Sequence, residues 1–176
     1  MLKIIKDECR RGRFIRYAPL FLWICVIFFL SSTLGSMSHT SRIIRPLLEW
    51  LFPDASAETI TLYHAYVRKF AHFTEYAILA FWSWRAFRRS GREFLIKYKY
   101  AVSLGLVGLV ASIDEFGQSF NPTRTGSPYD VLLDISGGLT MIVFLWIFIK
   151  KHNRNRSEVA QNDSENSQND SAGAIR

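Results

Sequence analysis

The chain has 176 residues, 49% of them apolar and 15% aromatic, and its 22 Lys and Arg against 15 Asp and Glu give a net charge of +7. Polar residues are concentrated at the two ends and in a few connecting stretches, whereas a soluble helical bundle would need amphipathic surface helices. The composition therefore predicts a membrane protein. Basic runs such as RRGRFIR could bind nucleic acid, but they flank apolar segments, so we expect them to set topology and attract anionic headgroups, with no nucleic-acid partner.

Four apolar windows are long enough, or nearly so, to cross ~30 Å of hydrocarbon. They cover residues 17–34, 70–87, 101–116 and 131–149. The second window carries His72, Glu75 and Arg85, and the third is short unless its helix continues through Gln118. We therefore predict an all-α, polytopic membrane protein with four transmembrane helices and a short interfacial helix after the first.

The abundance of Lys and Arg alternates along the connections between these windows. Seventeen lie before the first window, from Arg85 to Lys99 or after the fourth window, and five lie in the other two connections. Cytoplasmic loops carry the excess of such residues, so we expect both termini in the cytoplasm. The domains are then a basic amino-terminal segment (1–16), a transmembrane domain (17–149) and a basic, then disordered, cytoplasmic tail (150–176), since the tail lacks large apolar residues.

The amino-terminal segment has a second interpretation. The small-residue stretch SSTLGS follows the first window, as in a cleaved signal peptide, but the apolar run exceeds a usual signal core, so we favour a span. Cys9 and Cys25 lie at different depths of this segment and predict no disulfide.

The connection after the first window predicts an amphipathic helix lying in the membrane interface, with Trp50 near the headgroups. Pro53 marks a turn, and Asp54 or Ser56 can cap the next helix, which should start near Glu58 and run into the second window. The apolar residues at helical spacing in the interfacial helix are Ile43, Ile44, Leu47, Leu48, Leu51 and Phe52.

Packing residues are expected in the later windows. Gly105, Gly108, Gly137 and Gly138 predict close approach between spans, because small residues let helices pack tightly in lipid. The aromatic residues of the second span and its approach are interpreted as interfacial or packing groups. These are Tyr63, Tyr66, Tyr76 and Trp82.

The predicted topology brings ionisable residues from three spans to the outer leaflet. A charged side chain within a span costs ~2.5 to 3.5 kcal/mol, so such residues usually face a partner or a water-filled cavity. We therefore predict an outward-facing polar pocket. Its candidate ligand-binding residues are Lys69, His72, Glu75, Tyr76, Asp114, Glu115, Gln118, Arg124, Asp130 and Asp134.

Two stretches of these residues resemble the signatures of the VanZ-like family. RKFAHFTEYAILAF has a Lys, then a His, then an aromatic-rich helix with a Tyr four residues after the His. DEFGQSFNPTRTGSPYDVLLDISGG has an Asp-Glu pair, a Gln, an Arg in the following loop and an Asp opening the last helix. The resemblance covers residues 17–149 and departs at Asp134, where the family more often has Asn. It implies a protein that lowers sensitivity to the lipoglycopeptide teicoplanin, with no settled chemistry.

Several of these residues also have simpler roles. Asp130 can be an N-cap of the fourth span, and Arg124 can neutralise Asp114 or Glu115 as a structural ion pair. His72 can be a hydrogen-bonded packing residue, although Glu75, one turn away, favours a functional role.

Three classes of function fit the predicted pocket. In the first, it binds an amphiphile outside the cytoplasm, either a lipid-linked cell-wall precursor or a lipoglycopeptide, with Arg124 and Lys69 meeting phosphate or carboxylate. In the second, His72, Glu75, Asp114 and Glu115 form an acid/base or metal site acting on a lipid-linked substrate. In the third, the acidic residues line a proton or ion path, which the missing internal repeat disfavours.

We favour binding, with a membrane-embedded enzyme as the alternative. No HExxH or Cys-rich spacing supports a metal, and no cofactor is expected. The expected partners are membrane lipids and the bound amphiphile, in a multi-pass protein of the bacterial cytoplasmic membrane, and the sequence leaves the oligomeric state open.

Overall fold

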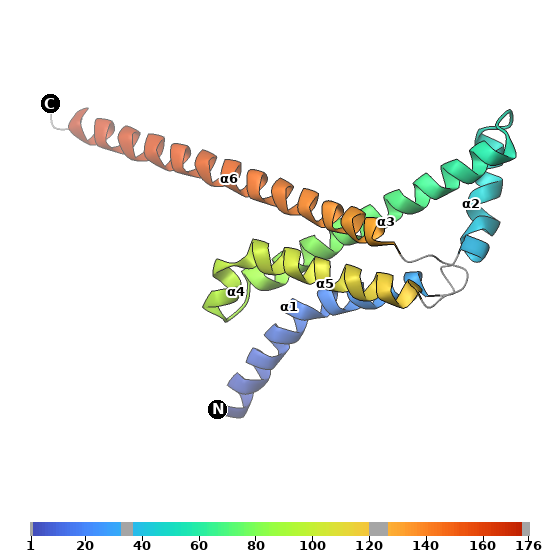
Figure 1. Cartoon of the computed structure of the whole chain (residues 1–176). Coiled ribbons are helices and arrows are strands. Elements are labelled where there is room, and N and C mark those ends of the chain that lie inside the picture. Colours follow the sequence, from blue (N-terminus) through green and yellow to red (C-terminus); the bar gives the residue numbers. More distant parts are fainter. Residues whose placement is uncertain (1, 33–36, 120–126, 174–176) are drawn as a thin grey trace. The chain divides into compact units, whose positions relative to one another are not determined.

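The computed structural model describes residues 2–32, 37–119 and 127–173, and regular structure in these ranges is helical throughout (Figure 1). The all-α prediction is therefore confirmed. Residues Met1–Ile142 form one compact unit, which contains every described candidate site residue, and Val143–Arg176 form a second. The helices are α1 (Leu2–Ser31), α2 (Met37–Leu51), α3 (Ala57–Arg88), α4 (Glu93–Lys97), α5 (Lys99–Ser119) and α6 (Pro128–Gly173).

Three of the described helices contain a segment long and apolar enough to cross a membrane. These segments are Phe14–Ser31 in α1, Lys99–Ser119 in α5 and Pro128–Glu158 in α6. They contain most of the first predicted window and all of the third and fourth, and α5 continues through Gln118 as the third window required. Helix α3 contains the second window, but its polar residues keep it less apolar than the other three, so a fourth span is not shown.

Large apolar side chains on the outer faces of these helices are uncovered. Phe21 of α1 is 70% exposed and Phe116 of α5 is 67% exposed. Contiguous apolar surface of this kind marks contact with a partner or a membrane. By contrast, the polar side chains of Asp114 and Gln118 on α5 are buried inside the bundle.

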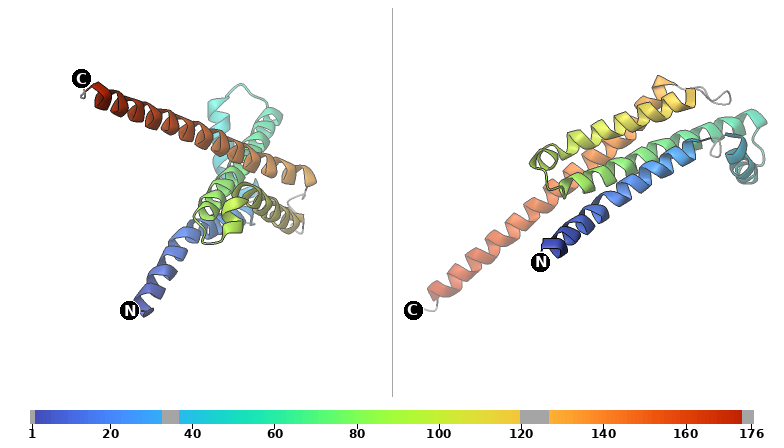
Figure 2. Two further views of the ribbon diagram at one scale, coloured as in Figure 1. Left: turned by 90° about the vertical axis from the view of Figure 1, so that its left-hand side faces the viewer. Right: turned by 90° about the horizontal axis from the view of Figure 1, so that it is seen from below.

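Helices α1, α3 and α5 lie side by side, with α3 antiparallel to both (Figures 1 and 2). The Tyr17 hydroxyl donates to Ser90 Oγ at 3.1 Å, and Trp23 Nε1 donates to the Glu75 carbonyl at 2.9 Å. The later residue of α1 therefore meets the earlier partner: Trp23 bonds to Glu75 of α3, and Tyr17 bonds to Ser90, just after α3 ends. Tyr76 and Leu79 of α3 are fully buried in this arrangement.

The first residues of α6 pack closely against α3 and α5 through glycine. A Cβ atom added to Gly137 would meet the Phe73 carbonyl oxygen, and one added to Gly138 would meet Val107 Cγ1 at 2.8 Å. The predicted close packing is therefore confirmed at these two glycines, and a Cβ at Gly108 would be in ordinary contact. The prediction is wrong for Gly105, where a Cβ would meet nothing within 4 Å, because this residue lies on an exposed face of α5.

Helix α2 covers the start of α3. Leu48 is buried, the rings of Phe52 and Tyr63 lie 5.1 Å apart, and Trp50 is 77% exposed, while its predicted place near the headgroups stays a prediction. Ser56 caps α3, since the Thr59 N–H donates to its Oγ at 3.2 Å, which confirms Ser56 rather than Asp54. The short helix α4, in the basic connection, was not predicted.

The second unit is the remainder of α6, which continues to Gly173. The chain has no Gly or Pro from residue 139 to residue 172, so nothing breaks the helix locally. Residues 150–158 are exposed, and Arg154 and Glu158 form an ion pair of 3.6 Å across one turn. Helix α6 therefore includes residues that we expected to belong to a disordered tail, and the disorder of residues 150–176 stays a prediction.

Candidate functional site

The polar residues of four helices gather at one end of the first unit. Helix α1 ends there at Ser31, α3 passes with residues 68–76, α5 ends with residues 114–119, and α6 begins at Pro128. The antiparallel order of α1, α3 and α5 produces this gathering, because the end of one helix meets the first half of the next. Side-chain contacts join these segments: α1 meets α5, α3 meets α5, and α3 meets α6.

Asp114 is the centre of a hydrogen-bonded group that joins three helices. Its Oδ2 accepts from Ser31 Oγ at 2.7 Å, from the Tyr76 hydroxyl at 3.2 Å and from Gln118 Nε2 at 3.1 Å. Asp114 and Gln118 are one turn apart on α5, as predicted, and Tyr76 comes from α3. Arg68 Nη2 donates to Gln118 Oε1 at 3.4 Å and so extends the group toward the end of the bundle.

A cavity of about 300 Å³ lies beside this group, between α1 and α5. Ser31, Asp114 and Gln118 supply its polar side, and Phe28 and Ile113 supply apolar walls. Ser32 and Gly117 complete the lining. The cavity therefore combines a buried carboxylate with apolar surface, a combination that suits an amphiphile.

The sequence analysis did not select Ser31, Phe28, Ile113 or Gly117 as site residues. Ser31 and Ser32 are the first polar residues after the apolar core of the first window, at the end that faces Asp114. That shared depth was a usable signal for Ser31. No pattern marks the other three, because a Phe, an Ile and a Gly in apolar helices are ordinary packing residues.

His72 of α3 faces Asp134 of α6. The His72 Nδ1 and Asp134 Oδ1 atoms are 3.7 Å apart, beyond a good hydrogen bond, and the Asp134 side chain is only 1% exposed. Neither Asp134 oxygen accepts a hydrogen bond from the described residues. A histidine beside a buried carboxylate is the arrangement by which a carboxylate orients a general base.

The remaining predicted residues surround this pair. Lys69 Nζ lies 3.8 Å from Asp130 Oδ1, and both side chains are more than one-third exposed, so this ion pair contributes little to stability. Glu115 Oε1 accepts the Ser127 N–H, which joins the end of α5 to the start of α6. Glu75 is half-buried, and its backbone carbonyl accepts the Trp23 bond.

Asp130 is not the N-cap of α6. The helix begins at Pro128, and Ser127 Oγ accepts the Tyr129 N–H at 3.3 Å, so Ser127 occupies the cap position. Asp130 is the third helical residue, where its carboxylate can turn toward Lys69 instead.

Arg124 lies outside the described residues, so its predicted pairing with Asp114 or Glu115 stays a prediction. Among the residues that the structure does describe, no three His, Cys, Asp or Glu side chains are grouped to hold a metal ion. The acid/base groups that the structure brings together are His72 with Asp134, and Tyr76 with Asp114.

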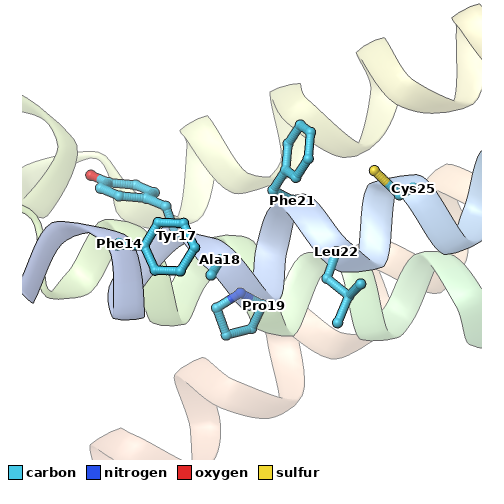
Figure 3. Close-up of a pocket in the computed structure, with 7 residues that line it drawn as sticks. All are labelled: Phe14, Tyr17, Ala18, Pro19, Phe21, Leu22 and Cys25. Atoms are coloured by element: carbon cyan, nitrogen blue, oxygen red, sulfur yellow. The ribbon is translucent and has the colours of Figure 1, made fainter. Parts of the chain in front are cut away.

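Two other cavities are lined by fewer polar side chains that could bind or react with a ligand. One of about 480 Å³, between α5 and the start of α6, is lined by Glu115 and mostly small or apolar side chains. The other, of about 650 Å³, lies along α1 alone and is apolar except for the Tyr17 hydroxyl and the Cys25 thiol (Figure 3). It falls within the apolar segment of α1, where lipid chains could cover it. Its seven lining residues are Phe14, Tyr17, Ala18, Pro19, Phe21, Leu22 and Cys25.

The helices and their exposed apolar faces define an integral membrane protein, and the described candidate site residues gather at one end of its first unit. A family model described as VanZ/LLP1 matches residues 16–149. The chain therefore belongs to the VanZ/LLP1 family, as the two sequence motifs predicted. No curated protein and no solved structure matches the chain.

Proposed function

We propose that the protein crosses the bacterial cytoplasmic membrane four times, with both termini in the cytoplasm and the Asp114 end facing outward. Helix α3 supplies the additional span. Its 32 residues extend about 48 Å, which exceeds the hydrocarbon thickness. Its antiparallel packing between α1 and α5 and the alternation of basic residues along the chain support this topology.

The cavity beside Asp114 binds an amphiphile of the cell envelope, and its lining is the observation that carries this proposal. The buried Asp114 carboxylate with Ser31 and Gln118 suits a polar headgroup, and Phe28 and Ile113 suit an apolar chain. A lipid-linked cell-wall precursor and a lipoglycopeptide of the teicoplanin type are amphiphiles of this kind. Binding would change the access of such a molecule to its target, which is how a VanZ-like protein could lower teicoplanin sensitivity without chemistry.

Lys69 and Arg124 remain the proposed cationic contacts for a phosphate or carboxylate of the same amphiphile. Lys69 is 59% exposed and paired only loosely with Asp130, so its ammonium group can turn to a ligand. Arg124, between α5 and α6 in the sequence, would supply the second cation.

A pair of glycine substitutions on α5 tests the cavity. A Cβ atom meets nothing within 4 Å at either Gly117 or Gly105, but only Gly117 lines the cavity. Gly117→Leu should therefore fill the cavity without a backbone clash, and Gly105→Leu is its matched control. We expect native mass spectrometry in mild detergent to show lipid copurifying with the wild type and Gly105→Leu, and at least ~10-fold less with Gly117→Leu. Equal retention in all three proteins would contradict the proposal.

The second candidate function is a membrane-embedded enzyme acting on a lipid-linked substrate, and the contact of His72 with Asp134 favours it. A carboxylate beside a histidine can orient it as a general base, and Asp134 is buried 3.7 Å from His72, so this contact must tighten into a hydrogen bond when the substrate binds. Of the four predicted catalytic residues, His72 best fits this role. Asp114 already accepts three hydrogen bonds, Glu115 accepts a backbone N–H, and Glu75 is half-buried on the turn after His72.

A further inference from the structure

We propose, on the basis of the amphiphile site above, that the cavity beside Asp114 binds the primary ammonium group of a lipid headgroup. The distribution of hydrogen bonds on this carboxylate is the first observation. Ser31, Tyr76 and Gln118 all donate to Oδ2. The other oxygen, Oδ1, accepts no hydrogen bond from the described residues, although Asp114 is only 4% exposed and lines the cavity.

The charge of Asp114 is the second observation. Its three donors are two hydroxyl groups and one amide, and none of them carries a positive charge. In the described part of the chain, no Lys, Arg or His nitrogen lies within ion-pair distance of Asp114. A buried carboxylate is costly unless a positive group pairs with it. Arg124, outside the described residues, stays a predicted partner, and an ammonium ligand would supply both a charge and an N–H donor for Oδ1.

In the proposed topology, the cavity lies near the outer end of α5, at the side of the lipid headgroups. Asp114 lies five residues before the end of α5, which is about 7.5 Å along the helix axis. Phe28 and Ile113, on the cavity wall, are 38% and 50% exposed, so an acyl chain can continue along them into the hydrocarbon. The volume of about 300 Å³ is several times the ~30 Å³ that one water occupies, which is enough for a headgroup but small for a whole lipid.

Arg68 indicates the rest of the headgroup. Its guanidinium group donates to Gln118 Oε1 at 3.4 Å, and Gln118 lines the cavity. A phosphate oxygen bound by Arg68 would therefore lie one side chain away from an ammonium group bound by Asp114. A bare anionic headgroup fits less well, because the Asp114 carboxylate would repel it. Phosphoethanolamine, with both groups on a short linker, has the required chemistry.

Phosphatidylethanolamine and phosphatidylcholine with identical acyl chains test this proposal. Both are zwitterionic, and the choline group differs by lacking N–H donors. The full-length protein is reconstituted in discs containing equal amounts of the two lipids and transferred to mild detergent, and the retained lipids are counted by native mass spectrometry. We expect about tenfold enrichment of phosphatidylethanolamine, the ratio expected of one hydrogen bond to a charged group.

Two variants, a control variant and a lipid series make the outcome decisive. Asp114→Asn keeps an acceptor for Ser31 and Tyr76 but removes the charge, and it should reduce the enrichment to near parity. Gly117→Leu should remove both lipids, and Gly105→Leu should match the wild type. If Asp114→Asn fails to fold, stepwise N-methylation of the headgroup gives the same test on the wild-type protein, since each step removes an N–H donor and should lower retention.

The two proposals can fail separately. Equal retention of the two lipids by the wild type, with both lost in Gly117→Leu, would overturn the ammonium proposal and leave the cavity as an amphiphile site. Enrichment that survives both Asp114→Asn and N-methylation would also overturn it. Retention that Gly117→Leu does not change would overturn both the ammonium proposal and the amphiphile site.

Discussion

Replacing Gly137 by Ala should separate α6 from α3 and destabilise the protein. A Cβ atom at this position would overlap the Phe73 carbonyl oxygen and would lie 3.0 Å from the carbonyl carbon and 3.1 Å from the Cα atom. Carbon atoms in contact prefer about 3.5 to 4.0 Å, so the two helices must move apart by at least ~0.5 Å. These are backbone atoms, which cannot rotate aside as a side chain can.

The magnitude follows from two opposing effects. Overpacking of a tight contact costs ~1 to 3 kcal/mol, and a backbone clash belongs at the upper end of this range. Replacing Gly by Ala within a helix returns up to ~1 kcal/mol of helix propensity. The net loss is then ~2 kcal/mol, which corresponds to a decrease of roughly 4 to 8 °C in melting temperature for a chain of this size.

Three other glycines provide graded controls in a thermal unfolding assay in detergent. Gly138→Ala should destabilise less, because it meets the Val107 side chain rather than backbone. Gly108→Ala, 3.8 Å from Ile135 Cδ1, and Gly105→Ala, with nothing within 4 Å, should be neutral or stabilising. The variants should also lengthen the distance between His72 and Asp134 in the same order. Asp134 lies about one turn before Gly137 on α6, and His72 directly precedes Phe73 on α3. A Gly137→Ala protein that melts at the temperature of Gly105→Ala would refute the close approach of the two helices.

Three further outcomes are expected. For topology, single cysteines replace Asp54 and Gly91, both exposed, in a cysteine-free background. An impermeant thiol reagent should label the cysteine at 54 in intact cells and the cysteine at 91 only after permeabilisation. The reverse pattern would place the proposed pocket on the cytoplasmic side. For pH, burial and the nearby Arg68 lower the pKa of His64, which lies outside the predicted span. Stability should therefore fall as the pH drops below the ordinary histidine pKa of ~6.5, because only the unfolded chain binds the proton there. His64→Leu should flatten the dependence of melting temperature on pH, and an unchanged dependence would exclude His64 as its source. For mechanism, His72→Gln should retain part of the activity if the pocket only binds, whereas acid/base catalysis predicts a loss of roughly 10²- to 10⁴-fold at normal expression, and such a loss would favour the enzyme.

Local patterns were sufficient for the helices and the family. Apolar windows predict helices that cover residues 101–116 and 131–149, Ser56 caps α3 as expected, and the two motifs identify the VanZ/LLP1 family. These features depend on the order of residues along one segment. The polar end of the bundle was also predictable, because alternating helix direction places the ends of successive spans together.

The pairing of polar groups was decided only by tertiary structure. Tyr76 and His72 are one turn apart on α3, yet Tyr76 donates to Asp114 of α5 and His72 faces Asp134 of α6. Spacing within a helix shows which residues share a face but not which neighbouring helix each one meets. Ser31 joined the site for the same reason, since its partner lies 83 residues away in the chain.

The sequence by itself determined that the protein is helical, and it placed the candidate polar residues of three predicted spans at one shared end, because these properties follow from composition and period along each segment. It could not determine that Gly137 touches the α3 backbone while Gly105 touches nothing, since a glycine has the same appearance in either setting. The distance between two helix axes depends on how their faces rotate toward each other. That rotation brings His72 to Asp134 and leaves one oxygen of Asp114 without a hydrogen bond from the described residues beside a cavity, and it is set only when all the helices pack together.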